Sequence, residues 1–255
     1  MNQNVKNCID FIQNYFRDNG TENTKAVIGI SGGKDSTIAA ALLVRALGAE
    51  RVVGVMMPNK TQNDIEDSIK VCDILGIKHY TINIGYAYDA LISSFTYDAE
   101  LPVSDQITTN APARLRMNAL YMVAAAVGGR VCNTGNASEA FIGYTTKYGD
   151  LAGDFAVLRP FTVTEIYEMG DSMEELPYDL VHKAPADGMS GKTDEDNIGI
   201  PYRVIDDHLL YGKIPADPNI WERMKTMHRR NIHKQDAVRL PMPYRQTFLF
   251  NKTWD

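Results

Sequence analysis

The sequence has no surplus of basic residues: 26 Lys and Arg stand against 32 Asp and Glu, which gives a net charge of -6 and a pI near 5.4. Broad nucleic-acid binding and attraction to an anionic membrane surface both favour a basic protein surface. The charge balance therefore argues against either kind of partner. A polyanionic substrate would have to be held in a local positive pocket.

Cysteines are few, and their spacing suggests no chemistry. Cys8, Cys72 and Cys132 are widely separated and lack the CxxC or Cys/His spacing of a zinc or redox site. We expect three buried thiols in a reducing compartment. Long apolar runs are also missing, both as a signal-peptide core near the N-terminus and as the ~18-residue run of a membrane span. The sequence predicts a cytoplasmic protein.

The remaining composition is that of an ordinary globular protein, with 44% hydrophobic and 23% charged residues. A chain of 255 residues is long enough for one domain with a fully buried sheet. We favour a single domain over residues 1–255 to two small ones.

Short apolar runs alternate with helical patterns along the chain. The strands are expected within residues 26–30, 51–58, 79–84 and 131–135. Four helices are expected within 64–76, 112–127, 162–173 and 201–212. Two more are expected to end near Arg17 and at Ala90, and another two to begin after Gly33 and at Asp217 as N-cap. This alternation predicts an α/β fold with a doubly wound, mostly parallel sheet flanked by helices.

Two glycine turns follow predicted strands, at Gly32 and at Gly135. In open α/β sheets, ligands bind at the carboxyl ends of the strands, so these turns are candidate walls of a site. The segment from His182 to Ile200 lacks periodicity and is expected to be a long loop. Loops of that length are usually functional or disordered, and we interpret this one as a candidate lid over the site.

The first turn lies in the sequence GISGGKDS, which bridges a strand and a helix. Small residues there let backbone N–H groups surround a phosphate at the helix N-terminus. The pattern is neither a Walker A loop, because Lys34 is followed by Asp35, nor GxGxxG. SGGxDS resembles the signature of the ATP pyrophosphatases, which implies that Asp35 holds Mg²⁺ and that ATP is a co-substrate. The loop residues that would bind ATP are Gly29, Ile30, Ser31, Gly32, Gly33, Lys34, Asp35 and Ser36.

Two further segments resemble the NAD synthetase family. NAPARLRM is similar to its NxxARxRM segment, and TGNASEAFIGYTTKYGD is similar to its TGxxSExxxGxxTKYGD segment. The resemblance implies that Thr134 contacts ATP, that Glu139 binds Mg²⁺ opposite Asp35, and that Lys147 holds the dinucleotide. Asp35, Glu139 and Lys147 are the expected catalytic residues. Arg114 and Asp154 would add substrate contacts.

The resemblance continues more weakly toward the C-terminus. NIHK is similar to an SxHKR ending, which implies that His233 and Lys234 contact the dinucleotide. Two positions depart from the family pattern: Val163 stands where a lysine touches ATP, and Ala186 stands where Ser or Thr is usual. Lysines that could compensate are Lys34, Lys183 and Lys192.

The reaction implied by the resemblance is the amidation of nicotinic acid adenine dinucleotide (deamido-NAD). Its carboxylate attacks the α-phosphate of ATP, ammonia then attacks the acyl-adenylate, and NAD, AMP and pyrophosphate result. Asp150, Asp154 or Asp187 could accept the proton of ammonium. The family also implies an adenine nucleotide alpha hydrolase-like fold and a homodimer. Because the matching segments fill most of the chain, we expect no glutaminase domain.

Two other functions stay open at this point. One is another adenylating amidotransferase or sulfurtransferase, acting on a different carboxylate, a nucleobase or tRNA; the lack of paired cysteines and the acidic balance count against tRNA thiolation. The other is a nucleotide-binding regulatory protein with reduced turnover, which only the departures at Val163 and Ala186 support.

Overall fold

The structure is a computed structural model that describes residues 2–61, 65–183 and 193–235. A single sheet runs through its centre with the strand order β3-β2-β1-β4-β5, and every strand pair in it is parallel. The strands are β1 (Lys25–Gly29), β2 (Val52–Met56), β3 (Lys78–Thr81), β4 (Gly129–Asn133) and β5 (Phe155–Ala156). The predicted parallel α/β fold is confirmed.

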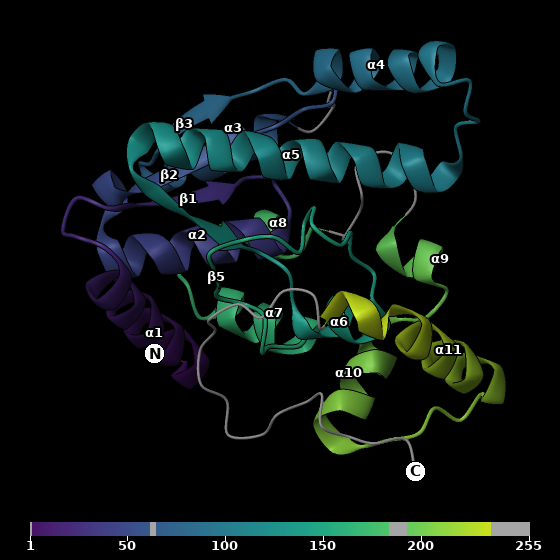
Figure 1. Ribbon diagram of the computed structural model, residues 1–255. Coiled ribbons are helices and arrows are strands. Elements are labelled where there is room, and N and C mark those ends of the chain that lie inside the picture. Colours follow the sequence, from purple (N-terminus) through teal and green to yellow (C-terminus); the bar gives the residue numbers. More distant parts are fainter. Residues whose placement is uncertain (1, 62–64, 184–192, 236–255) are drawn as a thin grey trace.

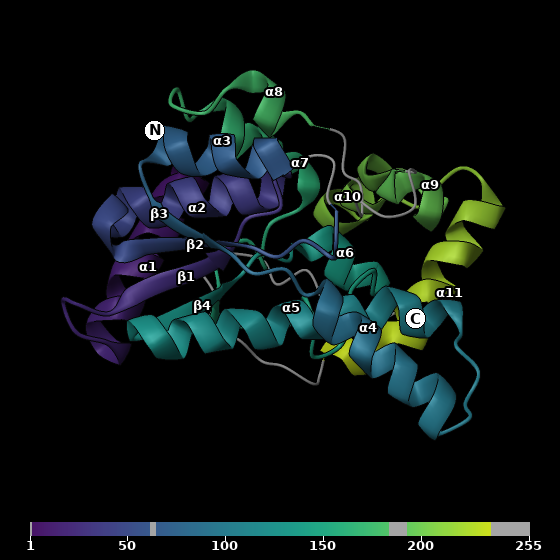
Figure 2. The same ribbon diagram turned by 90° about the horizontal axis from the view of Figure 1, so that it is seen from above.

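Helices cover both faces of the sheet, with α4 and α5 on one face and α1, α2 and α3 on the other (Figures 1 and 2). The sheet is therefore doubly wound, as expected from the alternation of elements. The helices are α1 (Gln3–Asn19), α2 (Lys34–Leu47), α3 (Ile65–Leu75), α4 (Gly85–Ser93), α5 (Asp105–Val127), α6 (Ala137–Ile142), α7 (Val163–Asp171), α8 (Tyr178–Val181), α9 (Asp194–Ile198), α10 (Tyr202–Tyr211) and α11 (Pro218–Gln235).

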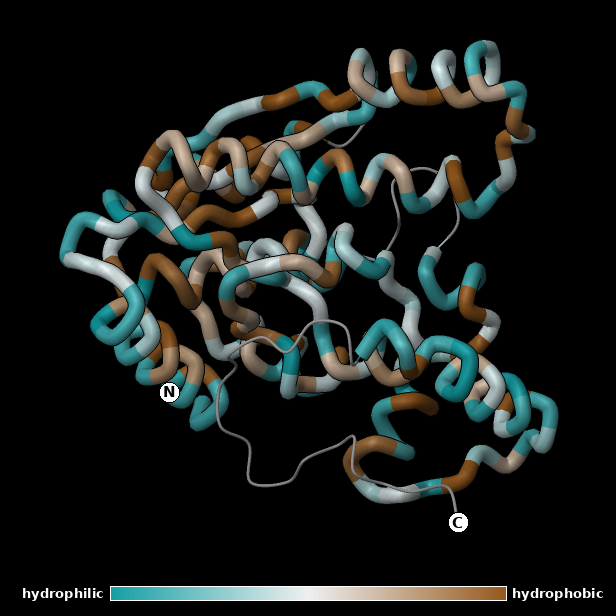
Figure 3. The backbone as a smooth tube through the Cα atoms, in the orientation of Figure 1, coloured by the Kyte–Doolittle hydropathy of each residue, from teal (hydrophilic) through white to brown (hydrophobic). Residues whose placement is uncertain are grey.

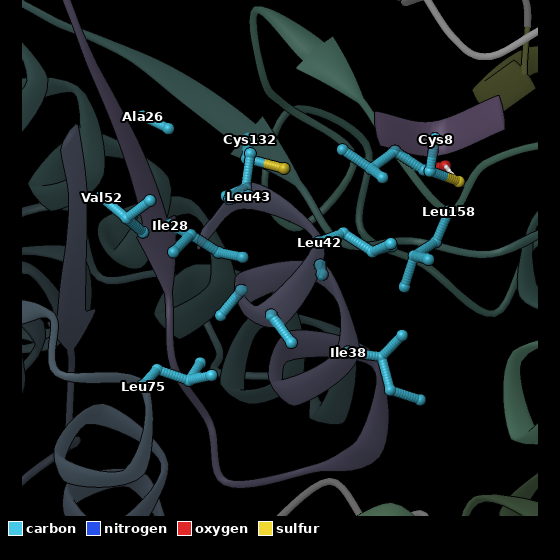
Figure 4. Close-up of a cluster of buried hydrophobic side chains, with 14 of the residues drawn as sticks. Cys8, Ala26, Ile28, Ile38, Leu42, Leu43, Val52, Leu75, Cys132 and Leu158 are labelled. Carbon is cyan, nitrogen blue, oxygen red and sulfur yellow. Dashed lines mark hydrogen bonds between the residues drawn. The ribbon is translucent and has the colours of Figure 1, made fainter. Parts of the chain in front are cut away.

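Alternate residues of each strand supply the two layers of the core. Val27 of β1 and Val131 of β4 pack with Val123 on the α5 side. Ile28 and Cys132, one position further along the same strands, face α2 instead, as Figure 4 shows. This alternation is what a strand buried on both faces requires, and it explains why the strand sequences are apolar throughout.

Some boundaries differ from those expected. The third strand ends at Thr81, although Ile82 still donates a backbone hydrogen bond to Met56 at the end of β2, and Ile84 donates one to Pro58 in the loop that follows. The strand β5 was not predicted, because two residues are too few to show a pattern. Helix α5 begins at Asp105 rather than near Pro112, since Ser104 starts its first turn and the proline is accommodated inside.

The helices toward the C-terminus were predicted better. Thr162 and Glu165 form the expected capping box of α7, and α11 begins at Pro218 as expected. The expected loop over 182–200 is wrong in part, because α9 forms there behind a capping box at Thr193. Residues 184–192 of that segment lie outside the described residues.

A second apolar cluster lies where α6, α10 and α11 meet, on the side of the molecule toward which the strands point (Figure 1). Phe141, Ile205 and Met224 are buried in it. The trace of α11 is mostly hydrophilic, whereas the strands are mostly hydrophobic (Figure 3). Within the described ranges, no helix is both long and apolar enough to cross a membrane.

Candidate active site

The site is placed by the order of the strands. From β1 the chain crosses to β2 on one side of it, whereas β4 pairs with the other side of β1. Loops that leave two such neighbouring strands diverge and open a crevice at the carboxyl edge of the sheet. The loop after β1 is residues 30–33, and the loop after β4 is residues 134–136. These are the two glycine turns that the sequence singled out.

The loop after β1 has the geometry of an anion cradle. Gly32 has a φ of 77°, and a Cβ at this position would lie 2.9 Å from the Cβ of Asp67, so glycine is required. Gly33 is the N-cap of α2 and contributes no side chain to cap it. The N–H groups of the first turn of α2 are therefore left for a ligand. Ser36 braces the loop by accepting a hydrogen bond from the N–H of Ser31 over 3.2 Å.

The loop after β4 is joined to the first loop by Asn136. Its side-chain oxygen accepts a hydrogen bond from the N–H of Glu139 over 2.9 Å, and its amide nitrogen donates to Asp35 over 3.4 Å. The carboxylate of Glu139 in turn accepts from the N–H of Asn136 over 3.2 Å, which completes a capping box. Asp35 and Glu139 are thereby held at the same crevice, as the sequence predicted.

Lys34 lies next to Asp35 and within the electrostatic influence of Glu139. Its ammonium donates to Asp35 over 2.7 Å, and the side chain is only 2% exposed. Burial by itself would lower the pKa of Lys34, but the negative charges of Asp35 and Glu139 outweigh it and raise that pKa. The lysine is therefore a charged group at neutral pH.

The carboxylates repel each other. Burial raises the pKa of Glu139, and the charge of Asp35 raises it further, whereas Lys34 and the N–H of Asn136 act in the opposite direction. A cation bound between the two carboxylates would relieve this repulsion. Mg²⁺ is usually held by one or two carboxylates together with phosphate oxygens and water, so this pair of donors fits the ion.

A second group of predicted residues gathers around the segment 143–147. Arg114 of α5 donates from its Nε to the carbonyl of Lys147 over 3.3 Å. Lys234 of α11 donates to the carbonyls of Gly143 and Thr145, each over 2.7 Å. Two cationic side chains, from α5 and α11, thus contact the segment that carries Lys147. Their contacts with a dinucleotide stay predictions.

The other predicted site residues lie differently. Thr134 lies in the loop after β4 beside Gly135, as expected for a ligand contact. The carboxylate of Asp154 accepts a hydrogen bond from the N–H of Val131 over 2.7 Å, so it links the residue before β5 to strand β4. His233 is exposed near the end of α11, whereas its neighbour Lys234 turns inward. The substrate roles of these residues stay predictions.

The structure describes one of the two positions that depart from the family pattern, Val163, but not the other, Ala186. Val163 is buried among apolar side chains at the start of α7, so this position offers no cation. Ala186 and Lys192 lie outside the described residues. Lys183 pairs with Asp67 over 2.7 Å. Of the two compensating lysines that the structure describes, Lys34 contacts Asp35 of the phosphate loop.

Arg159 was not singled out from the sequence. It is 8% exposed, and its Nη1 has no hydrogen-bond partner within the described residues. Burial lowers the pKa of its guanidinium, while the charges of Glu139 and Asp150 oppose that shift. A Cβ on Gly135 would lie 3.8 Å from this Nη1, which places Arg159 at the loop after β4. Its signal in the sequence is a lone arginine within the apolar run FAVLRPF.

A buried network anchors the helix that carries Glu139. Asp206 of α10 accepts hydrogen bonds from the hydroxyl of Ser138 and from both the N–H and hydroxyl of Thr164. The Ser138 hydroxyl also accepts from the N–H of Val163 over 3.0 Å. Helices α6, α7 and α10 are thus tied together directly beside Glu139, and no local sequence pattern indicates this arrangement.

The doubly wound parallel sheet, the glycine-rich phosphate loop and the paired carboxylates define a nucleotide-binding protein of the adenine nucleotide alpha hydrolase-like fold. The family model described as NAD synthase matches residues 4–240. The chain belongs to the NAD synthase family.

Relatives of this chain support the same assignment. An NH(3)-dependent NAD(+) synthetase of Pyrococcus horikoshii is 39% identical over 92% of both chains, and one of Methanococcoides burtonii is 40% identical over 78% of this chain and 74% of its own. An NMN synthetase from Francisella tularensis matches the structure with a TM-score of 0.83 and 33% identity, over 94% of this chain and 97% of its own. An NH3-dependent NAD synthetase from Campylobacter jejuni matches with a TM-score of 0.72 and 28% identity, over 94% and 99%.

Proposed function

We propose that this protein amidates deamido-NAD with ammonia at the expense of ATP and so forms NAD, AMP and pyrophosphate. The observation that carries the proposal is the Asn136 to Asp35 hydrogen bond, which brings the loop after β4 to the phosphate loop. Family membership and the names of the relatives support the same reaction.

In this reaction the phosphate loop positions ATP. The free N–H groups at the start of α2 receive the departing pyrophosphate, and the substrate carboxylate attacks the α-phosphate. Mg²⁺ held by Asp35 and Glu139 would neutralise charge on the leaving pyrophosphate. Arg114 and Lys234, which contact the segment 143–147, together with Lys147 in that segment, provide positive charge for an anionic dinucleotide despite the acidic net charge.

A proton acceptor is needed when ammonium supplies the nitrogen. The Asp154 carboxylate is engaged by the backbone of β4, and Asp187 lies outside the described residues. The Asp150 carboxylate accepts the N–H of Thr146, and burial raises the pKa of Asp150 to about 6 although the charge of Lys234 opposes this shift, so it can take up a proton near neutral pH. We therefore assign proton acceptance to Asp150.

A homodimer is part of the proposal. Exposed apolar side chains occur on both α4 and α5, the two helices that lie on one face of the sheet (Figure 1). They include Tyr86, Leu91 and Met122. Clusters of this kind commonly mark a protein interface, and a second copy of this chain is the partner that we propose here.

A second candidate product is NMN. The match to the Francisella NMN synthetase has the higher TM-score, 0.83 against 0.72 for the Campylobacter NAD synthetase. In that case the acceptor would be nicotinic acid mononucleotide, which carries the same reacting carboxylate. The fold and the ATP chemistry would be unchanged.

One assay separates these candidates. The purified chain is supplied with ATP, Mg²⁺ and ammonium, and with either deamido-NAD or nicotinic acid mononucleotide, while pyrophosphate and the amide product are followed. A higher kcat/KM with deamido-NAD is the expected result, and a higher value with the mononucleotide would favour the second candidate. Absence of pyrophosphate with both acceptors would contradict an amidating enzyme.

A further inference from the structure

Arg159 is a buried cation without a counter-ion. It lies in the segment between β5 and α7, and it is only 8% exposed. Its Nη1 has no hydrogen-bond partner, and its guanidinium makes no ion pair among the described residues. An arginine stays charged at neutral pH, and a buried charge is unfavourable unless it is paired. The guanidinium therefore has the properties of a group that awaits an anionic ligand.

The strand order places Arg159 at the same edge of the sheet as the other site loops. Strand β5 pairs in parallel with β4, and Asn133 at the end of β4 lies opposite Ala156 at the end of β5. The two following segments therefore leave the sheet side by side at its carboxyl edge. The N–H of Ala137 donates to the carbonyl of Phe161 over 2.8 Å, which holds these segments together. Arg159 thus belongs to a third loop beside the crevice.

The guanidinium and the carboxylate of Glu139 face the same side of Gly135. A Cβ on this glycine would lie 3.8 Å from the Nη1 of Arg159 and 4.0 Å from the Oε2 of Glu139. Burial lowers the pKa of Arg159, and the negative charges of Glu139 and Asp150 oppose this shift. Arg159 is therefore within electrostatic reach of two carboxylates, one next to the phosphate loop and one next to the segment 143–147.

This position selects one anion of the proposed reaction. The planar fork of arginine fits both phosphate and carboxylate groups. The departing pyrophosphate is assigned to the N–H groups at the start of α2, and the dinucleotide to the segment 143–147. The α-phosphate is joined to the pyrophosphate and is attacked by the carboxylate of the dinucleotide, so it has to be bound between those two places. Arg159 lies there.

We propose that Arg159 binds the α-phosphate of the nucleotide. Its charge stabilises the negative charge that this phosphate carries while the substrate carboxylate attacks, and the same contact holds AMP as it leaves. A cation thus reaches the nucleotide although Val163 at the start of α7 provides none. The inference rests on the proposed function in taking cleavage of ATP to AMP and pyrophosphate as the chemistry.

The test compares the binding of AMP with that of adenosine, which lacks the phosphate, by calorimetry in the presence of Mg²⁺. Pyrophosphate is titrated separately. The variants are Arg159→Met and Arg159→Gln, of which the second keeps a polar but uncharged side chain. The control is Arg130→Met, because Arg130 is exposed and donates to the carbonyls of Gly129 and Asn19, away from the carboxyl edge of the sheet. Melting temperatures of the ligand-free chains check that each variant is folded.

Both Arg159 variants are expected to bind AMP about tenfold more weakly, because a charged contact to phosphate is lost. Their affinities for adenosine and for pyrophosphate should equal those of the unmodified chain. The Arg130 variant should bind all three ligands normally. The ratio of AMP affinity to adenosine affinity is the decisive quantity, since a general disturbance of the fold lowers both values together.

An unchanged ratio in a folded Arg159 variant would overturn the proposal. So would a loss of pyrophosphate affinity with normal binding of AMP, because Arg159 would then serve the other phosphate group. An unmodified chain that binds AMP no better than adenosine would overturn it as well. An unmodified chain that binds AMP through Arg159 but forms no amide would refute the proposed function and leave this inference standing.

Discussion

The amide of Asn136 donates a 3.4 Å hydrogen bond to the carboxylate of Asp35, and this contact joins the loops that leave the neighbouring strands β1 and β4. Asn136 also caps α6 and so orients Glu139 toward the same point. One buried amide therefore sets the relative position of the two carboxylates. Two carboxylates about a hundred positions apart in the sequence are thus brought together, as the proposed Mg²⁺ site requires.

The first prediction concerns this pair of carboxylates. Asp35→Asn and Glu139→Gln are each expected to reduce turnover about 100-fold or more, because each removes a negative charge from the proposed Mg²⁺ site. Glutamine can replace glutamate in a capping box, so the second variant should remain folded. Initial rates are measured over a Mg²⁺ titration, together with thermal unfolding by circular dichroism.

The matched control is Asp89→Asn, because Asp89 is exposed and its carboxylate pairs with the exposed Lys60 over 2.8 Å. Its turnover is expected to be normal. Near-normal turnover in both the Asp35 and Glu139 variants would show that the two carboxylates do not bind a required ion.

The second prediction concerns the network behind Glu139. Asp206 is 2% exposed and accepts hydrogen bonds from Ser138 and Thr164. Asp206→Ala leaves buried donors unsatisfied and is expected to lower the free energy of unfolding by about 3 kcal/mol. The neighbouring Asp207 pairs with Lys213 nearer the surface, so Asp207→Ala should cost less than about 1 kcal/mol. Urea denaturation compares the two, and equal losses would contradict the anchoring role.

Much of the fold and part of the site could be predicted from the sequence. Apolar runs and helical periodicity are local signals, and the loop after β1 lies within one short segment, so Ser31 to Ser36 could be recognised directly. Arg114, Glu139 and Lys147 were found through resemblance. Asn136, Arg159 and Asp206 were missed because their roles arise from tertiary contacts: an amide between two loops, a lone buried guanidinium, and an aspartate whose partners lie 42 and 68 positions away.

The third prediction concerns the pH dependence of stability. His228 of α11 is buried against Phe141, with its Nδ1 2.7 Å from the carbonyl of that residue. Burial lowers the pKa of His228 below the value of 6.5 that it has in an unfolded chain, and the charge of Arg229 acts in the same direction. The unfolded state therefore binds the proton more readily. The contribution of His228 to stability should be present above pH ~6.5 and be lost as the pH falls below it.

The test compares the unmodified chain with His228→Asn by urea denaturation at pH 7.5 and pH 5.5. Asparagine keeps a donor for the Phe141 carbonyl but does not titrate in this range. The unmodified chain is expected to lose more free energy of unfolding between the two pH values than the variant does. Equal losses would mean that His228 has no part in the acid sensitivity.

The fourth prediction concerns the proposed homodimer. Met122 on α5 is 64% exposed, and Tyr86 and Leu91 on α4 are exposed as well. Met122→Glu should shift the protein toward a monomer, because a charge in an apolar interface loses hydration without gaining a partner. Size exclusion with light scattering measures the mass. Ile214→Glu is the control, since Ile214 is 67% exposed but lies between α10 and α11. A dimer unaffected by Met122→Glu would place the interface elsewhere.

The last prediction concerns the nitrogen donor. Hydrolysis of glutamine by a cysteine requires a thiolate beside a base or another cation. The three cysteines of this sequence, Cys8, Cys72 and Cys132, are all buried, and burial raises the pKa of each thiol, to about 11 for Cys72. None of them is suited to attack glutamine at neutral pH, which agrees with the names of the NH(3)-dependent relatives.

The purified chain should therefore form the amide product with ammonium and should form almost none with glutamine as the sole nitrogen source. The measurement follows NAD formation from deamido-NAD, ATP and Mg²⁺ in preparations shown to contain no free ammonia or contaminating glutaminase. Treatment of the native chain with a thiol alkylating reagent is the control, and it should leave the ammonium-dependent rate unchanged because the thiols are buried and protonated. Comparable rates with both donors, of which the reagent abolishes only the glutamine-dependent one, would instead identify one of the three cysteines as a glutamine-hydrolysing nucleophile.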